Sequence, residues 1–172
     1  MKRKFLTLIG LGLVLTATGC GGSKTETNTV SVIEEENTSG SEIYVSFGDS
    51  EKFALHLYEN ETAEALQTFA AMDEWQLPIY HYDDYENWEV MQYYELPSKY
   101  EVPTNPEEVT SEAAGSVYFS EDNEILLFYK DAEVEGEFTP VGYFDYTDEF
   151  LDAVENNPVL EGWGNKLIHI SA

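Results

Sequence analysis

The sequence predicts a mainly β fold with two helices, arranged as a closed antiparallel barrel of about eight strands. Short runs of β-branched, aliphatic and aromatic residues recur along the chain, and turn-forming residues separate them. Helix caps followed by apolar residues at helical spacing occur early, at 60–72, and late, at 147–155. Closing the strands into a barrel would leave no exposed sheet edges.

The fold is centred on a hairpin. Val117–Phe119 and Ile125–Tyr129 are short strand-forming runs, and the residues 120–124 between them favour a turn. Residues 125–128 form an unbroken apolar run, Ile-Leu-Leu-Phe. We therefore expect this second strand to be covered on both faces.

Further strands are predicted on both sides of this hairpin. Alternating apolar residues predict a first hairpin at 43–47 and 53–57, around the turn Gly48-Asp49-Ser50. Other strands are expected at 77–82, 88–94, 140–144 and 167–170. Asn105-Pro106 is a cap followed by proline, which predicts a single helical turn at 105–108.

Each predicted helix has a cap and one apolar face. Asn60 caps the first helix, and its inward residues are predicted to be Ala65, Leu66, Phe69 and Met72. Thr147 caps the second helix, which is predicted to bury Phe150, Leu151 and Val154 and to stop at Asn156-Asn157-Pro158.

The N-terminus predicts export from the cytoplasm. Residues 2–4 are basic, 5–15 are almost wholly apolar, and small residues precede Cys20, so 1–19 is predicted to be a signal peptide. The ending resembles the lipobox of bacterial lipoproteins, which implies a lipid on Cys20 and retention at the extracytoplasmic face of the cell membrane. Residues 20–41 are predicted to be a disordered tether and 42–172 the folded domain. The alternative is a secreted protein whose Cys20 has no special role.

The charge balance limits the possible partners. Asp and Glu number 34 against 8 Lys and Arg, for a net charge of −26, and three of the basic residues lie in the predicted leader. The negative electrostatic field of such a chain disfavours nucleic acid as a partner and favours cations or basic partners. Alternatively, most of these carboxylates form a solvated coat that keeps the protein soluble. A single cysteine excludes an internal disulfide. We expect a monomer.

The order and spacing of several motifs resemble those of the small bacterial cyclophilin-like domain family, often found as lipoproteins. The matching segments are Ile43-x-Val45-x-Phe47-Gly48, Asn60-x-Thr62-Ala63-x-x-Leu66, Gly115-x-Val117-Tyr118-Phe119, Ile125-x-x-Phe128-Tyr129-Lys130 and Thr139-Pro140-Val141-Gly142. This resemblance implies a cyclophilin-like barrel over roughly 43–154, and it supplies no catalytic residues to transfer.

An enzyme of this fold class remains the alternative hypothesis. True cyclophilins isomerise prolyl peptide bonds with an arginine beside an apolar proline pocket, and this chain has no arginine after Arg3. Lysine lacks the planar fork of donors that arginine offers. A prolyl isomerase that assists secreted proteins is therefore disfavoured.

The sequence supplies no catalytic, cofactor or metal motif on which to build a site. His56, His81 and His169 lack the spacing of a zinc site. The acidic run 83–89 could hold calcium weakly, or it could be an exposed loop, because the spacing of an EF-hand is missing.

Aromatic residues are unusually dense between 80 and 100. Tyr82, Tyr85, Trp88, Tyr93 and Tyr94 form a possible ligand surface, because such side chains combine large apolar faces with polar tips. Alternatively, alternate members fill the barrel and the others pack against it. We therefore predict a membrane-anchored binding module for an unknown peptide, protein or small molecule.

Overall fold

The computed structural model describes residues 40–80, 90–157 and 166–172. These residues lie within one compact unit, Thr38–Ala172. The predicted signal peptide, Cys20 and nearly all of the predicted tether fall outside the described residues, as do His81, Tyr82, Tyr85 and Trp88. Among the described residues, no helix has the length and apolar character needed to cross a membrane.

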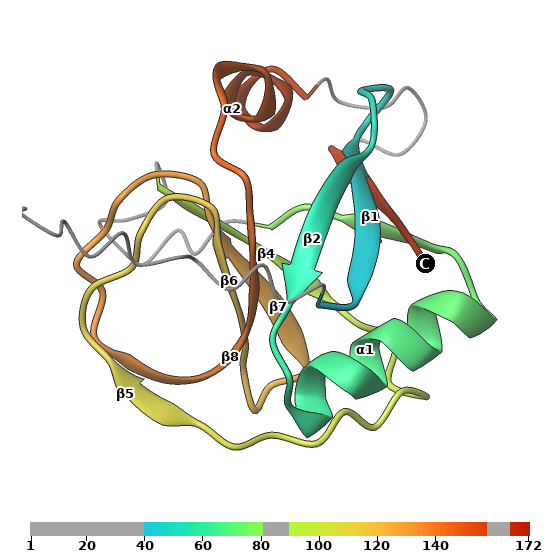
Figure 1. Ribbon diagram of the computed structural model, residues 1–172, viewed down its shortest axis with the longest axis vertical. Coiled ribbons are helices and arrows are strands. Elements are labelled where there is room, and N and C mark those ends of the chain that lie inside the picture. Colours follow the sequence, from blue (N-terminus) through green and yellow to red (C-terminus); the bar gives the residue numbers. More distant parts are fainter. Residues whose placement is uncertain (1–39, 81–89, 158–165) are drawn as a thin grey trace, which may run out of the picture. The chain divides into compact units, whose positions relative to one another are not determined.

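Nine strands and two helices make up the described fold (Figure 1). The strands are β1 Glu42–Phe47, β2 Phe53–Leu57, β3 Trp75–Pro78, β4 Met91–Glu95, β5 Glu107–Val109, β6 Ser116–Phe119, β7 Glu124–Phe128, β8 Gly136–Phe144 and β9 Leu167–Ser171. Eight of them follow the order β3-β9-β1-β2-β8-β6-β7-β4, and β5 pairs with β8 outside that path. Neighbouring strands pair antiparallel. The prediction of a mainly β barrel with two helices is confirmed.

One pair of hydrogen bonds brings the two ends of this sheet together. Tyr80 and Tyr93 exchange backbone N–H···O bonds of 2.9 and 3.0 Å between the chain after β3 and strand β4. Continuing the same register by two residues places Pro78 opposite Glu95. Because proline has no N–H to donate, the ladder does not extend in that direction. The barrel is therefore nearly closed.

The central hairpin has the predicted form. Its turn runs through Ser120 and Asn123, where Asn123 has a positive φ of 67°. All five residues of β7 are buried. Ile125 and Leu127 point into the barrel, whereas Leu126 and Phe128 belong to a separate apolar cluster on its outer side. Both faces of this strand are covered, as the unbroken apolar run predicts.

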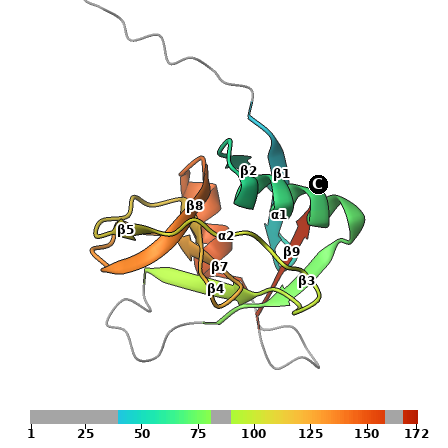
Figure 2. The same ribbon diagram turned by 90° about the horizontal axis from the view of Figure 1, so that it is seen from below.

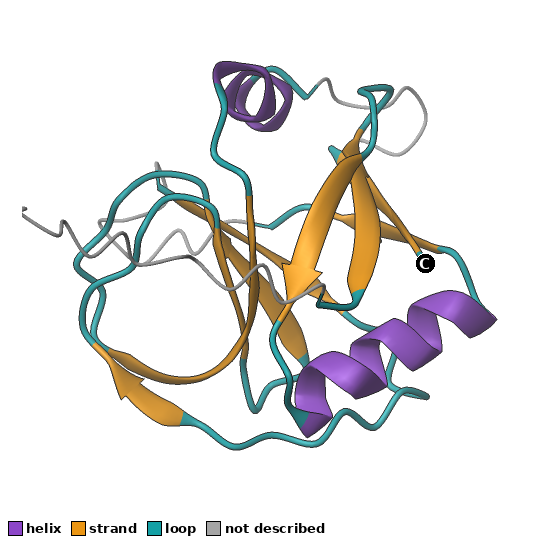
Figure 3. Ribbon diagram, in the orientation of Figure 1, coloured by secondary structure: helices purple, strands orange, loops and turns teal. Residues whose placement is uncertain are grey.

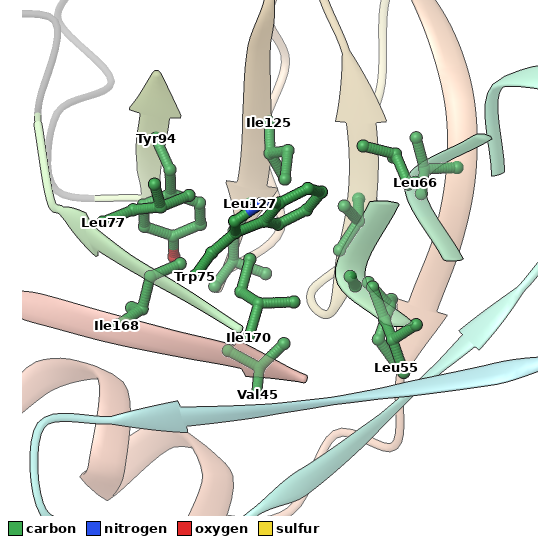
Figure 4. Close-up of a cluster of buried hydrophobic side chains, with 14 of the residues drawn as sticks. Val45, Leu55, Leu66, Trp75, Leu77, Tyr94, Ile125, Leu127, Ile168 and Ile170 are labelled. Carbon is green, nitrogen blue, oxygen red and sulfur yellow. The ribbon is translucent and has the colours of Figure 1, made fainter. Parts of the chain in front are cut away.

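The barrel interior is filled by apolar side chains. Figure 4 shows Trp75, Tyr94, Leu127 and Ile170 converging from four different strands, with Leu66 reaching in from the first helix. The void that remains among these side chains has a volume of about 10 Å³. A single water molecule needs about that much room, so this interior does not accommodate a ligand.

Helix α1, Glu61–Met72, begins at the predicted cap. The Ala63 N–H donates to Asn60 Oδ1 over 2.9 Å, and Asn60 Nδ2 donates to the Pro140 carbonyl over 2.9 Å, which fixes the helix start to β8. The predicted burial of Met72 is wrong, because its side chain is 73% exposed. Six residues of helix place Met72 about 120° around the axis from the buried Leu66. Ala63 and Ala70 complete the buried face instead.

Helix α2, Asp148–Glu155, follows the sequence prediction closely. Its first turn is capped by Thr147 Oγ1, which accepts from the Phe150 N–H over 3.1 Å. Phe150 and Val154 are fully buried. The Phe150 ring stacks on Phe144 with centroids 5.0 Å apart and meets Phe47 edge-on at 5.7 Å. Figure 3 shows the two helices at opposite ends of the barrel.

The helical turn predicted at 105–108 is wrong. This segment leads into β5, where Glu107 pairs with Phe138 and Val109 pairs with Gly136 (Figure 2). The Asn105 N–H donates to Thr139 Oγ1 over 2.9 Å, so the segment is bound to β8 before the strand begins. Long-range pairing here overrides a local cap signal. Pro106 precedes the strand, where it removes no ladder hydrogen bond.

Candidate functional site

A second, smaller core lies on the outer side of the barrel. It contains the buried Met91 of β4, Leu126 and Phe128 of β7, and Val134. Half-buried Tyr93, Tyr118, Ala132 and Phe138 pack against it. These residues meet because alternate side chains of β4, β6 and β7 point away from the interior. The chain from Ala132 to Phe138 covers them.

The covering segment is held in place by backbone pairing and one buried carboxyl group. Glu112 and Ala132 exchange backbone hydrogen bonds of 3.0 and 2.9 Å. The Val134 N–H donates to Glu112 Oε2 over 3.2 Å, whereas the buried Oε1 atom has no partner. Burial raises the pKa of the Glu112 carboxyl group, although its hydrogen bonds from backbone N–H groups act in the opposite direction.

Beside the second core, the surface is hollowed into a groove with a volume of about 280 Å³. Met91, Val134 and Phe138 provide its apolar floor. Its rim is formed by polar residues from two separate elements, the turn between β6 and β7 and the start of β8: Ser120, Glu121, Asp122, Glu135 and Glu137. We call this feature the groove.

The shape of the groove depends on a glycine. A Cβ atom at Gly136 would lie 2.4 Å from the nearest ring carbons of Phe138. The Phe138 ring can therefore lie over position 136 only while that residue has no side chain. This arrangement places an aromatic ring, half-exposed, at the groove floor.

Within the described part of the chain, the acidic residues of the groove have no lysine among the lining residues to balance them. Among the described residues, Lys99 pairs with Asp73 and Lys130 pairs with Glu155, whereas Lys52 donates to Ser171 and Lys166 donates to the Glu155 carbonyl. None of these four lysines lines the groove. Close to the second core, burial raises the pKa of the Tyr118 hydroxyl, and the charges of Glu112 and Glu107 raise it further. The lining thus offers apolar surface together with unneutralised carboxylates.

Two of the five aromatic residues that the sequence analysis grouped, Tyr93 and Tyr94, lie in the described part of the chain. Tyr94 is 3% exposed, and its hydroxyl donates to Gln92 Oε1 over 3.2 Å inside the barrel. Tyr93 is half-buried against the second core and stacks on Tyr80 with ring centroids 5.3 Å apart. Tyr94 therefore belongs to the barrel interior, and Tyr93 packs against the second core. Tyr82, Tyr85 and Trp88 lie outside the described residues.

Other exposed tyrosines lie on β1, directly after β2 and on β8. Tyr44, Tyr58 and Tyr143 are each between 39% and 46% exposed. The His56 ring packs at a tilt against Tyr143, with centroids 5.1 Å apart. Its ring nitrogens lie 3.0 Å from Glu42 and 3.4 Å from Asp145. These tyrosines were not singled out from the sequence, although Tyr44 and Tyr143 alternate with buried residues along their strands.

Acidic side chains also gather at a second, more open hollow beside Glu112. Asp131 and Glu133 line it, but Asp131 Oδ1 already accepts the Ala114 N–H over 2.9 Å. Within the ranges that the structure describes, no three His, Cys, Asp or Glu side chains are placed to hold a metal ion. The groove therefore remains the better-formed candidate.

Comparison with known proteins places this arrangement in a structural context. A family model described as the cyclophilin-like family matches residues 45–160, more than half of the chain. The solution structure of the hypothetical protein AF2241 from Archaeoglobus fulgidus is similar, with a TM-score of 0.50 and 15% identity over 80% of this chain and 98% of that chain.

The structure of McbB in complex with tryptophan is also similar, with a TM-score of 0.50 and 15% identity over 75% of this chain. The match spans 44% of that chain. At this level of identity, both likenesses concern the fold. No curated protein matches the sequence.

Proposed function

The chain belongs to the cyclophilin-like family, and on that premise we propose that it is a binding module that holds a ligand in the groove, at the extracytoplasmic face of the cell membrane. The observation that carries the proposal is the contrast between a filled barrel and a hollow beside it. The barrel void measures about 10 Å³, whereas the groove measures about 280 Å³. A ligand therefore has room outside the barrel and not within it.

The residues at the groove favour holding a ligand over transforming it. Ser120 is buried, and its hydroxyl donates to Glu124 Oε2 over 3.3 Å rather than to a histidine base. The chain also has no arginine after Arg3, so the guanidinium on which true cyclophilins depend is not available. The remaining lining is apolar or carries carboxylates.

Anchoring of the module is supported by the N-terminal pattern. A basic start and an apolar run form the pattern of a secretory leader, and the small residues before Cys20 resemble a lipobox. The chain between Cys20 and Glu42 is rich in Gly, Ser, Thr and Glu, a composition that suits a flexible spacer. In this proposal, the lipid fixes the location and the groove selects the ligand.

Nuclear magnetic resonance with a neutral peptide tests the groove. The probe is the hexapeptide Ser-Ala-Leu-Pro-Ala-Ser, titrated into the full chain in a neutral detergent. We expect shifts concentrated on the methyl groups of Met91 and Val134, and loss of these shifts in Phe138→Ala. Met72→Ala, an exposed apolar truncation on α1, is the matched control. Shifts spread over the surface, or unchanged by Phe138→Ala in a folded variant, would count against the groove.

The same sample decides between binding and catalysis. In a standard prolyl-peptide isomerisation assay, we expect the rate to equal that of the uncatalysed reaction. A rate increase that Phe138→Ala abolishes would replace the binding module with an isomerase.

Membrane anchoring has a separate test. Cys20→Ala is expected to move the protein from the membrane fraction to the soluble fraction, with Ser23→Ala as the control that should stay bound. Equal membrane retention of Cys20→Ala and the unmodified chain would contradict the lipid anchor, without affecting the groove.

A further inference from the structure

We propose that the groove selects a basic peptide segment, in which one apolar side chain rests on the floor and a lysine or arginine on each side meets the acidic rim. This inference rests on the proposed function and extends it by naming the chemistry of the ligand. It draws on the size of the groove, on the origin of its acidic residues and on the placement of the lysines.

The size of the groove suits a side chain of a peptide. Its volume of about 280 Å³ lies just below the range of about 300–1,000 Å³ in which small-molecule sites fall. The floor made by Met91, Val134 and Phe138 is apolar. One aliphatic or proline side chain can cover it, while the rest of an extended peptide passes over the rim.

The rim carries charge from two elements that are distant in sequence. Glu121 and Asp122 come from the turn after β6. Glu135 directly precedes β8, and Glu137 lies at its start. All four side chains are exposed. A cationic side chain on either side of the apolar contact would therefore meet a carboxylate, and opposite charges at a rim increase the rate and the selectivity of association.

No ion pair formed among the described residues satisfies this rim. The lysine–carboxylate pairs in the described ranges involve Asp73 and Glu155, which lie elsewhere. Binding a basic peptide would thus supply positive charges that the described part of the chain does not place at the rim. An acidic peptide would meet repulsion at both sides of the groove.

The overall charge of the protein must be separated from the effect of the rim. With a net charge of −26, the chain attracts any cationic molecule weakly. The proposal concerns the local rim, so its test compares two variants that lose the same charge. The rim variant is Glu121→Gln, Asp122→Asn, Glu135→Gln and Glu137→Gln. The control variant is Glu51→Gln, Glu59→Gln, Glu74→Gln and Glu101→Gln, whose exposed positions do not line the groove.

The probes are four fluorescent pentapeptides with capped ends: Gly-Lys-Leu-Lys-Gly, Gly-Gln-Leu-Gln-Gly, Gly-Glu-Leu-Glu-Gly and Gly-Lys-Ser-Lys-Gly. Fluorescence anisotropy measures their dissociation constants for the full chain in a neutral detergent at fixed ionic strength. We expect the first peptide to bind about tenfold more tightly than the second, as two partly screened charge contacts allow. The acidic peptide should bind most weakly, and serine in place of leucine should weaken the basic peptide.

The two variants locate the effect. The rim variant is expected to lose most of the tenfold preference for the basic peptide, whereas the control variant should keep it. Equal losses in both variants would show that overall charge, not the rim, attracts the peptide, and would overturn the inference. Equal affinities for the basic, neutral and acidic peptides would also overturn it while leaving a peptide-binding groove intact. Binding of none of the peptides would remove the proposed function as well.

Discussion

Replacing Gly142 with alanine is expected to open the barrel at the junction between its two halves. Gly142 lies in β8 opposite Leu57 of β2, and this pair of strands joins β3-β9-β1-β2 to β8-β6-β7-β4. An added Cβ atom would lie 2.1 Å from the His56 carbonyl oxygen and 3.2 Å from the Leu57 Cα atom. Both obstacles are backbone atoms, so no side-chain rotation relieves the clash.

The size of the effect follows from these distances. Ordinary contact begins near 3.4 Å, so the Cβ atom and the carbonyl oxygen must separate by about 1.3 Å. The neighbouring hydrogen bond from Tyr58 N–H to the Val141 carbonyl is 2.9 Å long. A similar opening would lengthen it to about 4.2 Å, beyond hydrogen-bonding range. Loss of this hydrogen bond, which leaves backbone groups without partners, should lower the free energy of unfolding by about 3 kcal/mol. For a domain of this size, that corresponds to a fall of roughly 10 °C in melting temperature.

Circular dichroism during urea and thermal unfolding measures this loss. Gly136→Ala is the matched control, because its new Cβ atom would meet the Phe138 ring and not the backbone. A side chain can rotate away, so we expect a loss below about 1 kcal/mol there, within the range of small packing changes. If Gly142→Ala were as stable as Gly136→Ala, the close approach of β2 and β8 would not have the energetic role assigned to it.

Three further substitutions test the core and the titrating groups. Leu127→Ala removes a side chain that is 1% exposed in the barrel and should lower the free energy of unfolding by about 2–5 kcal/mol in urea; a loss under 1 kcal/mol would contradict the filled interior. Burial raises the pKa of the Glu112 carboxyl group, so the folded state favours its protonated form. The resulting contribution to stability is complete below the ordinary glutamate pKa and is lost as the pH rises through the raised pKa of the folded state. The stability of Glu112→Gln relative to the unmodified chain should therefore increase between pH 4 and pH 7, and a flat difference would refute this. Hydrogen bonds from Lys99, and to a lesser extent from Tyr100, lower the pKa of the Asp73 carboxyl group. In Lys99→Met, nuclear magnetic resonance of the side-chain carboxyl groups should show this pKa rising toward its ordinary value. An unchanged titration of Asp73 would disprove the Lys99–Asp73 contact.

Local patterns were sufficient to predict most of the barrel. Alternation marks β1 and β2, and the unbroken apolar run 125–128 marks the strand buried on both faces. Caps at Asn60 and Thr147 mark both helix starts. These signals depend on neighbours in the sequence, so they can be read without knowing the fold.

The errors occurred where distant pairing decides the outcome. Asn105-Pro106 has the local form of a helix start, yet the pairing of Glu107 with Phe138 makes the segment a strand. Met72 fits an apolar stripe only if the stripe is centred on Phe69, whereas the structure centres it on Leu66 and Ala70. The groove could not be predicted either. Its floor and rim combine residues 91, 120–122 and 134–138, which no local pattern connects.

The position of the proposed site follows from what the outer face of β7 requires. Leu126 and Phe128 point away from the barrel and would form an exposed apolar patch unless another segment covered them. The chain from Ala132 to Phe138 supplies that cover, and it is held there by the Glu112–Ala132 pairing and by the pairing of β5 with the start of β8. The cover does not close completely over Phe138, which stays half-exposed at the groove floor. A barrel whose interior is full can thus offer a binding surface beside it, because the same alternation that fills the interior also builds the second core.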